Sequence, residues 1–316
     1  MNCTTNTLKL FVKRHGHDVE YWEHEFHRGE DDGWGLVSPE DDDYPYLIDG
    51  DGKDVEIGYF KKGKNEGQPN KKGAPEFLFY RGDITLLNKE SFSRNVAVIG
   101  LINPTNEIIE RERRIVAELV SRGANIVSGL ALGCDSISHI TCLENSGKTI
   151  AILPSQINKI VPADNTALAE EIVARGGLLL SEYFTPPDSW NKYDALNRFV
   201  ERDRLQAYFS NSILLIASYR HVKDGEPNCY PNDGIKRDSG ARHAMKFAKD
   251  IGRKRYVMYS EKSDGNNEMF DLNKEIIQES DGDKLTAKVV SPALIDEMLS
   301  VHISTKAEQL VLPLNG

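Results

Sequence analysis

The spacing of apolar and polar positions changes at Val96, where short aliphatic runs begin to alternate with amphipathic stretches. The runs have the length and composition of strands buried on both faces, and they cover 96–100, 125–129, 149–154, 178–182, 212–218 and 255–260. The stretches between them predict helices over 107–121, 134–144, 165–174, 194–209 and 241–249. Alternating strands and helices predict a doubly wound, mainly parallel α/β sheet of the Rossmann-like class.

The flanks of this core predict smaller units. Residues 77–80 and 84–87 are predicted to form a lead-in hairpin or a strand that enters the core. Beyond Ser260 we expect short helices over 272–277 and 293–301 and a polar tail. The predicted domains are an N-terminal extension with the lead-in hairpin, a Rossmann-like domain and a short helical C-terminal tail, at 1–90, 91–262 and 263–316.

Charge narrows the classes of function. The 316 residues include 39 Lys and Arg and 49 Asp and Glu, which gives a net charge of -10. Segment 95–260 holds 21 basic and 19 acidic residues, so the acidic excess lies in the flanks. This balance argues against a nonspecific nucleic-acid coat, which is driven by phosphate neutralisation, and leaves a local basic groove open.

The expected location is cytoplasmic. No apolar run approaches the roughly 20 residues that cross a bilayer, and the N-terminus lacks the features of a secretory signal. The four cysteines are scattered without a CxxC pair, which suits a reducing compartment. We therefore expect no membrane association.

In open α/β sheets, ligands bind where strands end and helices begin. The junction after the first core strand lacks GxGxxG, which disfavours an NAD site. The second junction runs from Ser128 to Asp135, and its Gly129 and Gly133 allow backbone N–H groups to approach a phosphate at a helix N-terminus. Alternatively, the glycines serve only the turn and helix packing, and Asp135 only complements the helix dipole. Both interpretations stay open.

Three further junctions carry polar side chains. Ser181 and Glu182 end the fourth core strand, as ligands or as an ordinary cap. The next helix carries arginines that either point guanidinium groups at a phosphate or form a solvated face, namely Arg198, Arg202 and Arg204. The last junction is a basic loop entering a helix, either an anion site or a capped surface helix, with Lys236, Arg237, Ser239, Gly240 and Arg242.

No catalytic constellation is evident. There is no GxSxG motif, and Cys134 has no evident histidine partner. The N-terminal histidines fit no HExxH helix or zinc-finger spacing, and His139 is expected to be packed or hydrogen-bonded. The sequence predicts a protein that is not an enzyme, with no metal and no cofactor.

Taken in order, the motifs resemble the DNA-processing protein A (DprA/Smf) family. The resemblance spans about residues 44–260 and rests on Tyr44-Pro45-Tyr46-Leu47, PEFLFYRGDITLLN, VAVIG, SGLALGCDSISH, TIAILPSQINKIVPADN, LLLSEY, RFVERDR and SGARHA. It implies a Rossmann-like protein that binds single-stranded DNA and helps a RecA-type recombinase in DNA uptake or recombination, without catalysis. It also implies a homodimer.

The resemblance carries a pocket over to this chain. Its residues would be Ser128, Gly129, Gly133, Asp135, Ser181, Glu182, Arg198, Arg202, Arg204, Ser239 and Gly240. Additional cations would come from Lys236, Arg237, Arg242 and His243, and surfaces for base stacking from Phe199, Tyr183 or Tyr208.

The chain departs from the family pattern at three positions of this pocket. Ile102 and Leu132 stand where the family usually has arginine, and Asp203 stands where asparagine is common. A C-terminal winged-helix domain is also not expected within 263–316. These departures keep an alternative open: a sensor or enzyme, for instance in a defence system, that binds a free nucleotide or a nucleotide-derived signal in the same pocket. A continuous basic track would favour DNA, and a closed pocket would favour a nucleotide.

Overall fold

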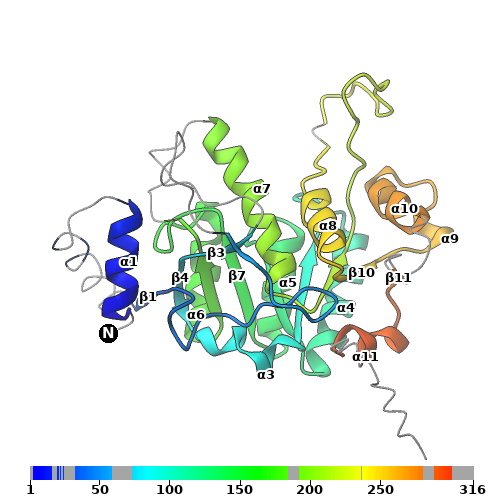
Figure 1. Cartoon of the computed structure of the whole chain (residues 1–316). Coiled ribbons are helices and arrows are strands. Elements are labelled where there is room, and N and C mark those ends of the chain that lie inside the picture. Colours follow the sequence, from blue (N-terminus) through cyan, green and yellow to red (C-terminus); the bar gives the residue numbers. More distant parts are fainter. Residues whose placement is uncertain are drawn as a thin grey trace, which may run out of the picture.

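The computed structural model describes residues 3–15, 20, 22, 24, 33–58, 73–183, 192–235, 237–279 and 288–300, with the backbone alone at 192–196. Within these residues, one sheet of nine strands has the order β1-β4-β8-β7-β6-β5-β9-β10-β11 (Figure 1). The strands from β5 to β11 pair in parallel, whereas β1 and β4 are antiparallel to their neighbours. Their bounds are β1 (Trp34–Val37), β4 (Leu78–Gly82), β5 (Asn95–Ile99), β6 (Asn125–Ser128), β7 (Thr149–Leu153), β8 (Leu178–Ser181), β9 (Ser212–Leu215), β10 (Lys254–Val257) and β11 (Lys288–Val289).

The predicted core strands are all present as β5 to β10, which confirms the doubly wound, mainly parallel fold. Every residue of β5 to β9 is buried, as expected for strands covered on both faces. Alternate residues point to opposite faces, so Ala97 and Ile99 pack in one hydrophobic cluster and Val96 and Val98 in another. The sheet is therefore the middle layer of three.

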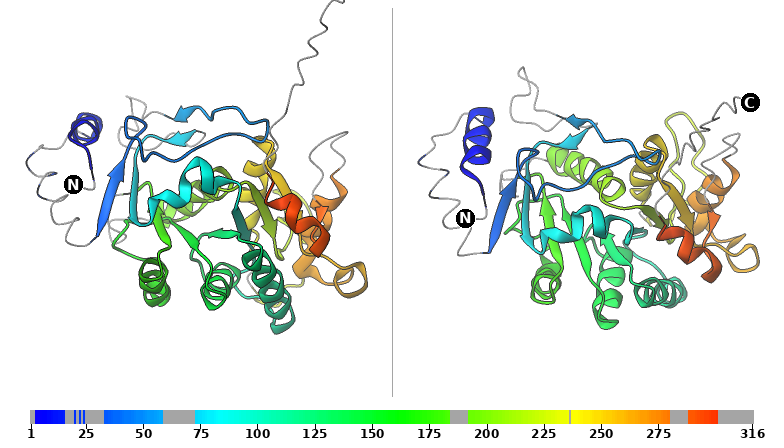
Figure 2. Two further views of the ribbon diagram at one scale, coloured as in Figure 1. Left: turned by 90° about the horizontal axis from the view of Figure 1, so that it is seen from below. Right: turned by 60° about the horizontal axis from the view of Figure 1, so that its bottom comes forward.

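Helices cover both faces of the sheet (Figure 2). One face is covered by α4 (Asn106–Ser121), α5 (Cys134–Glu144) and α6 (Thr166–Ala174), the last preceded by the 3-10 turn η2 (Ala163–Asn165). The other face is covered by α7 (Lys192–Tyr208) and α8 (Ala241–Asp250). The helix predicted from residue 165 thus begins as a 3-10 turn, and the other predicted core helices are present.

The predicted N-terminal extension contributes to the main sheet. β4 lies antiparallel to β8, and β1 continues the sheet beyond β4. Of the two forms predicted for this segment, the strand that enters the core is confirmed by β4. The hairpin is wrong, because Ile84–Leu87 is the 3-10 helix η1, followed by α3 (Lys89–Phe92). The Asp83 side chain accepts a hydrogen bond from the Thr85 N–H, and this cap starts a helical turn where the apolar run had indicated a strand.

An aromatic cluster joins α1 (Thr5–His15) to this edge of the sheet. The ring of Phe11 meets Trp22 and Phe77 edge-on, with centroid distances of 4.9 and 5.1 Å. β2 (Ile57–Gly58) and β3 (Ala74–Pro75) form a separate parallel pair.

The described part of the predicted C-terminal tail contains short helices and adds the short strand β11 beside β10. Its helices pack on the sheet through buried residues such as Phe270, Ile295 and Met298. They are α9 (Glu261–Asp264), η4 (Glu268–Phe270), α10 (Asp271–Gln278), η5 (Pro292–Leu294) and α11 (Ile295–Met298). None of the helices in the described part of the chain is long and apolar enough to cross a bilayer.

The direction of winding reverses at β5. From β5 the chain moves through α4 to β6 on one side, whereas β9, which pairs on the other side of β5, is reached from β8 through α7. In open α/β sheets the crevice beyond such a switch point binds ligands. The residues after β5, β6 and β9 therefore define where a site is expected.

Candidate nucleic-acid interface

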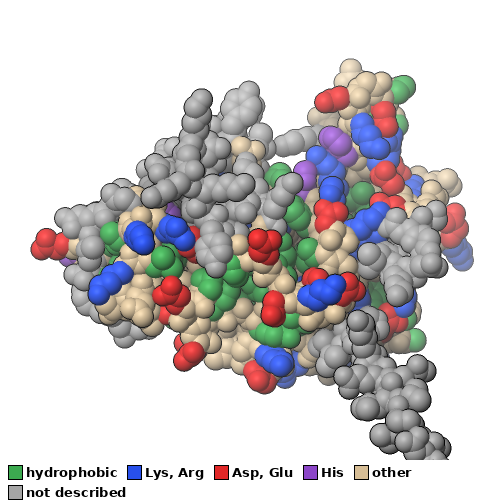
Figure 3. Space-filling view, viewed as in Figure 1, with side chains coloured by type: hydrophobic (Ala, Val, Ile, Leu, Met, Phe, Trp, Pro, Cys, Tyr) green, Lys and Arg blue, Asp and Glu red, His purple; other side chains and the backbone are tan. Residues whose placement is uncertain are grey.

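The candidate site lies at the end of the molecule where the parallel strands finish. α7 and the loop of residues 216–240 between β9 and α8, called here the β9–α8 loop, both rise from this end (Figure 1). Figure 3 shows Lys, Arg and His side chains, interspersed with Asp and Glu side chains, around the start of α8 and along this loop. Charged groups of both signs thus lie at the end of the sheet where ligands are expected.

The turn between β6 and α5 already holds an anion, the carboxylate of Asp135. Its Oδ2 accepts hydrogen bonds from the backbone N–H groups of Gly129 and Ala131, at 3.1 and 3.3 Å. The N–H of Cys134 donates to the Leu101 carbonyl at 2.9 Å. Because these donors are occupied, they are not open to a bound phosphate.

The two glycines of this turn are required by packing. A Cβ at Gly129 would lie 1.5 Å from Arg202 Nη1. Gly133 has a φ of +76°, and a Cβ there would lie 2.3 Å from the carbonyl oxygens of Leu101 and Ile102. Of the two interpretations that the sequence left open, the geometry favours the turn and packing role.

Arg202 fills the space that Gly129 leaves. The side chain is 4% exposed, its Nη1 donates to the Ile152 carbonyl at 3.0 Å and lies 4.0 Å from Asp135 Oδ2, and its Nε lies 3.2 Å from Asp203 Oδ1. Burial raises the pKa of Asp203 to about 7, with Arg202 opposing the shift. The charge of Arg202 is therefore used inside the fold, and Asp203 titrates near neutral pH.

Arg204 and Glu182 form a buried ion pair. Arg204 Nη1 and Nη2 donate to the two carboxylate oxygens at 2.7 and 2.5 Å, and both side chains are almost completely buried. Arg204 Nη1 also donates to the Glu201 carbonyl at 2.6 Å. This corrects the expectation that both residues line an open groove, because each satisfies the other inside the fold.

The two predicted serines are also internal. Ser128 Oγ donates to the Val98 carbonyl and Ser181 Oγ to the Ser155 carbonyl, each at 2.6 Å, and both residues are fully buried. They therefore order the strand ends and do not reach a ligand in this arrangement.

Arg198 lies one helical turn before Arg202 and is partly exposed. Its guanidinium carbon is 4.3 Å from the centroid of the Tyr183 ring, a cation–π contact. Tyr183 is buried and donates from its hydroxyl to Glu201 at 2.9 Å, and Tyr208 is buried as well. Neither tyrosine is therefore open to base stacking, whereas Phe199 is partly exposed.

The start of α8 carries the second accessible arginine. Ser239, Gly240 and Arg242 are partly exposed, and Arg242 Nη1 donates to the Ser239 carbonyl at 3.3 Å and to its hydroxyl at 3.2 Å. Burial, together with Arg242 and His221, lowers the pKa of His243 to about 4. His243 is consequently neutral at pH 7 and does not add the cation that the sequence suggested. The predicted Lys236 lies outside the described residues.

Arg237 anchors the β9–α8 loop. Its Nη2 lies 2.8 Å from Asp233 and 3.0 Å from Glu268 in η4, and its side chain is 7% exposed. The guanidinium carbon is 5.2 Å from the centroid of the Tyr230 ring. The prediction that Arg237 supplies a cation to a phosphate groove is therefore wrong, because its guanidinium group forms ion pairs with Asp233 and Glu268.

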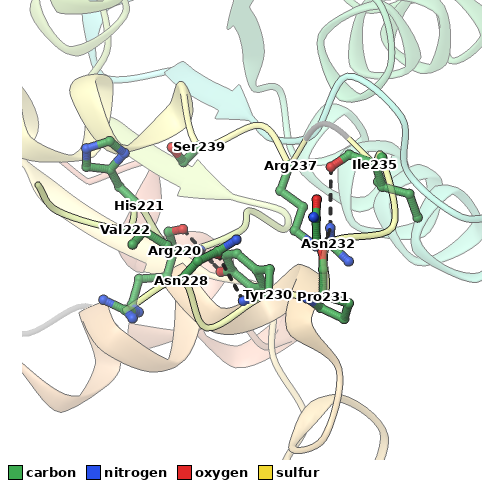
Figure 4. A pocket seen from close by; sticks show the side chains of 11 residues that line it. Arg220, His221, Val222, Asn228, Tyr230, Pro231, Asn232, Ile235, Arg237 and Ser239 are labelled. Carbon is green, nitrogen blue, oxygen red and sulfur yellow. Dashed lines mark hydrogen bonds between the residues drawn. The ribbon is translucent and has the colours of Figure 1, made fainter. Parts of the chain in front are cut away.

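The β9–α8 loop borders an open cavity that the sequence did not indicate. Its volume is about 440 Å³, and its lining includes Arg220, His221, Tyr230, Arg237 and Ser239. Figure 4 shows His221 and Ser239 on one side, Arg237 and Ile235 on the other, and Tyr230 between them. The Tyr230 hydroxyl bonds both the backbone N–H and the carbonyl of Arg220. Only the basic and aromatic composition of 219–237 hinted at it.

The structure tests the histidine expectations in part. His139 is fully buried, and its Nδ1 lies 2.6 Å from Thr149 Oγ1, which confirms a packed, hydrogen-bonded role. Burial lowers its pKa to about 3. Among the residues that the structure describes, no three His, Cys, Asp or Glu side chains are grouped to hold a metal ion.

Known proteins share this sequence and fold. The chain is 32% identical over 183 residues to the Smf protein of Synechocystis, and the aligned region covers 57% of this chain and 39% of the relative. It is 32% identical over 144 residues to the DNA processing protein DprA of Bacillus subtilis, covering 45% of each chain. The chain therefore spans less than half the length of these relatives.

Two solved structures are similar. DprA of Streptococcus pneumoniae aligns over 90% of this chain and 79% of its own, with a TM-score of 0.62 and 24% identity. DprA of Helicobacter pylori, described as having a single-stranded DNA binding mode, aligns over 76% of this chain and 91% of its own, with a TM-score of 0.53 and 25% identity.

The sequence profile of the DNA recombination-mediator protein A family matches residues 37–225. This match includes β2 to β9 and the arginines of α7. Since it covers more than half of the chain, the protein belongs to the DNA recombination-mediator protein A family.

Proposed function

We propose that this protein binds single-stranded DNA at the ends of its parallel strands and acts in DNA processing by binding, without a chemical step of its own. The observation that carries the proposal is the family match over 37–225, which includes the turns and α7 at this end of the sheet. The H. pylori relative, described as binding single-stranded DNA, supports the choice of ligand.

Arg198 and Arg242 are the cations that we assign to phosphates. Both are partly exposed, and they belong to α7 and α8, which pack together. Arg242 lies in the first turn of α8, and the Asp238 carboxylate just before it accepts a hydrogen bond from the Gly240 N–H at 2.9 Å. Lys236 is retained as a third candidate on sequence grounds.

The test is fluorescence anisotropy with labelled oligo-dT and its duplex counterpart. We expect the wild type to prefer the single strand, and Arg198→Ala/Arg242→Ala to weaken binding roughly tenfold or more, because two charge-assisted phosphate contacts are lost. The matched control is Arg122→Ala/Arg175→Ala. It also removes two positive charges, but at the C-terminal ends of α4 and α6, away from the end where the parallel strands finish. Equal losses in both variants would contradict the assignment, and absence of binding by the wild type would overturn the function.

A free nucleotide is the second candidate ligand, and the cavity in the β9–α8 loop favours it. A volume of about 440 Å³ lies in the range of small-molecule sites. Adding thymidine monophosphate to the same titration separates the two functions. Binding of the mononucleotide without binding of oligo-dT supports the sensor alternative.

We also propose two protein partners, because the family resemblance implies them: a RecA-type recombinase and a second copy of the chain. Light scattering over a range of concentrations measures self-association, and co-sedimentation with RecA filaments measures the other contact.

A further inference from the structure

Two exposed aliphatic side chains lie beside the switch point of the sheet. In the described residues, the large hydrophobic side chains that are exposed belong to Ile102, Leu132, Ile235 and Val289. Isolated exposed apolar residues are common on protein surfaces and need no explanation. The position of Ile102 and Leu132 is what requires one, because they follow the neighbouring strands β5 and β6.

The turns that carry these residues are in direct contact. The Cys134 N–H donates to the Leu101 carbonyl at 2.9 Å, and Gly133 lies directly against the Leu101 and Ile102 carbonyl groups. The Asp135 carboxylate fixes the second turn through two backbone N–H groups. Ile102, 40% exposed, and Leu132, 41% exposed, therefore belong to one rigid double turn.

The chemistry of the double turn suits an apolar ligand group. Its N–H donors at Gly129, Ala131 and Cys134 are already bonded within the protein. The nearest arginine, Arg202, is buried against Gly129 and Asp135. A phosphate placed against these three N–H groups would thus lose water without gaining a hydrogen bond from them or a contact with Arg202.

Two partly exposed arginines belong to the neighbouring helices α7 and α8. Arg198 is one helical turn from Arg202, and Arg202 contacts the double turn. Arg242 interacts electrostatically with the Asp203 carboxylate, which follows Arg202 in α7. A single strand whose phosphates lie on Arg198 and Arg242 can turn a base toward Ile102 and Leu132. Aliphatic side chains pack against bases in known complexes by apolar contact.

We propose that Ile102 and Leu132 form an apolar platform that packs against one base of the bound single strand. This inference rests on the proposed DNA-binding function and adds a base contact to it. The platform makes affinity depend on the presence of bases as well as phosphates.

The test compares oligo-dT with an abasic oligonucleotide of the same number of phosphates, by fluorescence anisotropy on the full chain. We expect Ile102→Ser/Leu132→Ser to weaken oligo-dT binding roughly tenfold, because apolar burial is lost, and to leave abasic binding unchanged. Val289→Ser removes an exposed aliphatic side chain from β11 and is the control, with no change expected.

A second variant keeps the test valid if the first one is poorly folded. Ile102→Arg/Leu132→Arg is expected to strengthen binding of the abasic strand and to reduce the preference for oligo-dT. An unchanged affinity of the serine variant for oligo-dT, or equal losses on both oligonucleotides, overturns the platform alone. Failure of the wild type to bind either strand overturns the DNA-binding function and the platform together.

Discussion

The pKa of Asp203 is subject to opposing effects from its surroundings at the site. Its side chain is 14% exposed and lies 3.2 Å from Arg202 Nε. Burial raises its pKa from the ordinary 3.8 to about 7, Arg202 opposes this shift, and Asp135 and Asp238 add to it. The folded protein therefore holds this proton more tightly than the unfolded chain does, and the associated stability is lost as the pH rises from about 4 to about 7.

Asp203→Asn is expected to remove this pH dependence. The free energy of unfolding of the variant, relative to the wild type, should rise between pH 5 and pH 8 by on the order of 2 kcal/mol, since the wild type alone acquires a buried charge. Urea unfolding at the two pH values measures it. The difference between the pH values is diagnostic, because it cancels any constant effect of the substitution.

Asp164→Asn is the control, because Asp164 is an exposed carboxylate before α6. It should change the unfolding free energy by the same small amount at both pH values. A flat difference for Asp203→Asn as well would show that Asp203 is ionised throughout this range.

The arginines of α7 show what the sequence reveals at the scale of a residue. Helical spacing correctly places Arg198 and Arg202 on one face of α7. The partners that bury Arg202 and Arg204 come from other elements, namely Asp135 in α5 and Glu182 after β8. Spacing within one helix indicates the face on which a side chain lies but not the residues that it contacts. An arginine in a buried ion pair therefore cannot be distinguished in the sequence from an arginine that binds a phosphate.

At the scale of elements, the turn between β6 and α5 packs tightly against Arg202 of α7. The helix α5 begins at Cys134, and the Asp135 carboxylate closes the turn in front of it. Gly129 is placed where no side chain fits beside Arg202. This turn, Arg202 and Asp135 therefore form one packed unit.

Gly129→Ala is expected to destabilise the protein by about 2 to 4 kcal/mol, because the new Cβ would displace a buried arginine from its partners. Chemical denaturation measures the loss. In an Arg202→Ala background the same change should cost less, since the main clash is gone.

Gly240→Ala is the matched control, since Gly240 has an ordinary helical backbone, and a Cβ there would meet only Asp238 Oδ1, at 3.2 Å. Its effect should stay within about 0.5 kcal/mol. If Gly129→Ala were equally mild, Arg202 would have another position available, and the packed unit would not exist as described.

The elements that the sequence predicted are those with strong local patterns. The aliphatic runs of β5 to β10 are buried on both faces and are recognisable alone. β1 has four residues, all buried, and such a short run gives no periodicity to detect. The sequence allowed a hairpin arm at Ile84–Leu87, where the structure has a 3-10 helix, because a short apolar run does not reveal that Asp83 caps a helical turn.

At the scale of the molecule, the three predicted segments share one sheet. β1 and β4 come from the first segment, and β11 comes from the last. Pairings such as β4 with β8 join residues about a hundred positions apart, and no local pattern specifies them. The fold class was therefore predictable from the sequence, whereas the full extent of the sheet was not.

The charge of the whole chain sets how its DNA binding should respond to salt. The chain carries a net charge of -10, and ion pairs within the protein engage Arg202, Arg204 and Arg237. If Arg198 and Arg242 neutralise two phosphates, log K should fall with log salt at a slope of about -1.4. Raising the salt from about 50 to 200 mM should then weaken binding roughly sevenfold.

Anisotropy titrations with oligo-dT at four or more salt concentrations measure this slope. The Arg198→Ala/Arg242→Ala variant should show a slope shallower by about 1.4, whereas Ile102→Ser/Leu132→Ser should keep the wild-type slope with a lower affinity, because a base contact releases no counterions. A wild-type slope steeper than about -4 would require six or more phosphate contacts. That result would mean a basic track extending well beyond Arg198 and Arg242, and would contradict a site built from two arginines and an apolar platform.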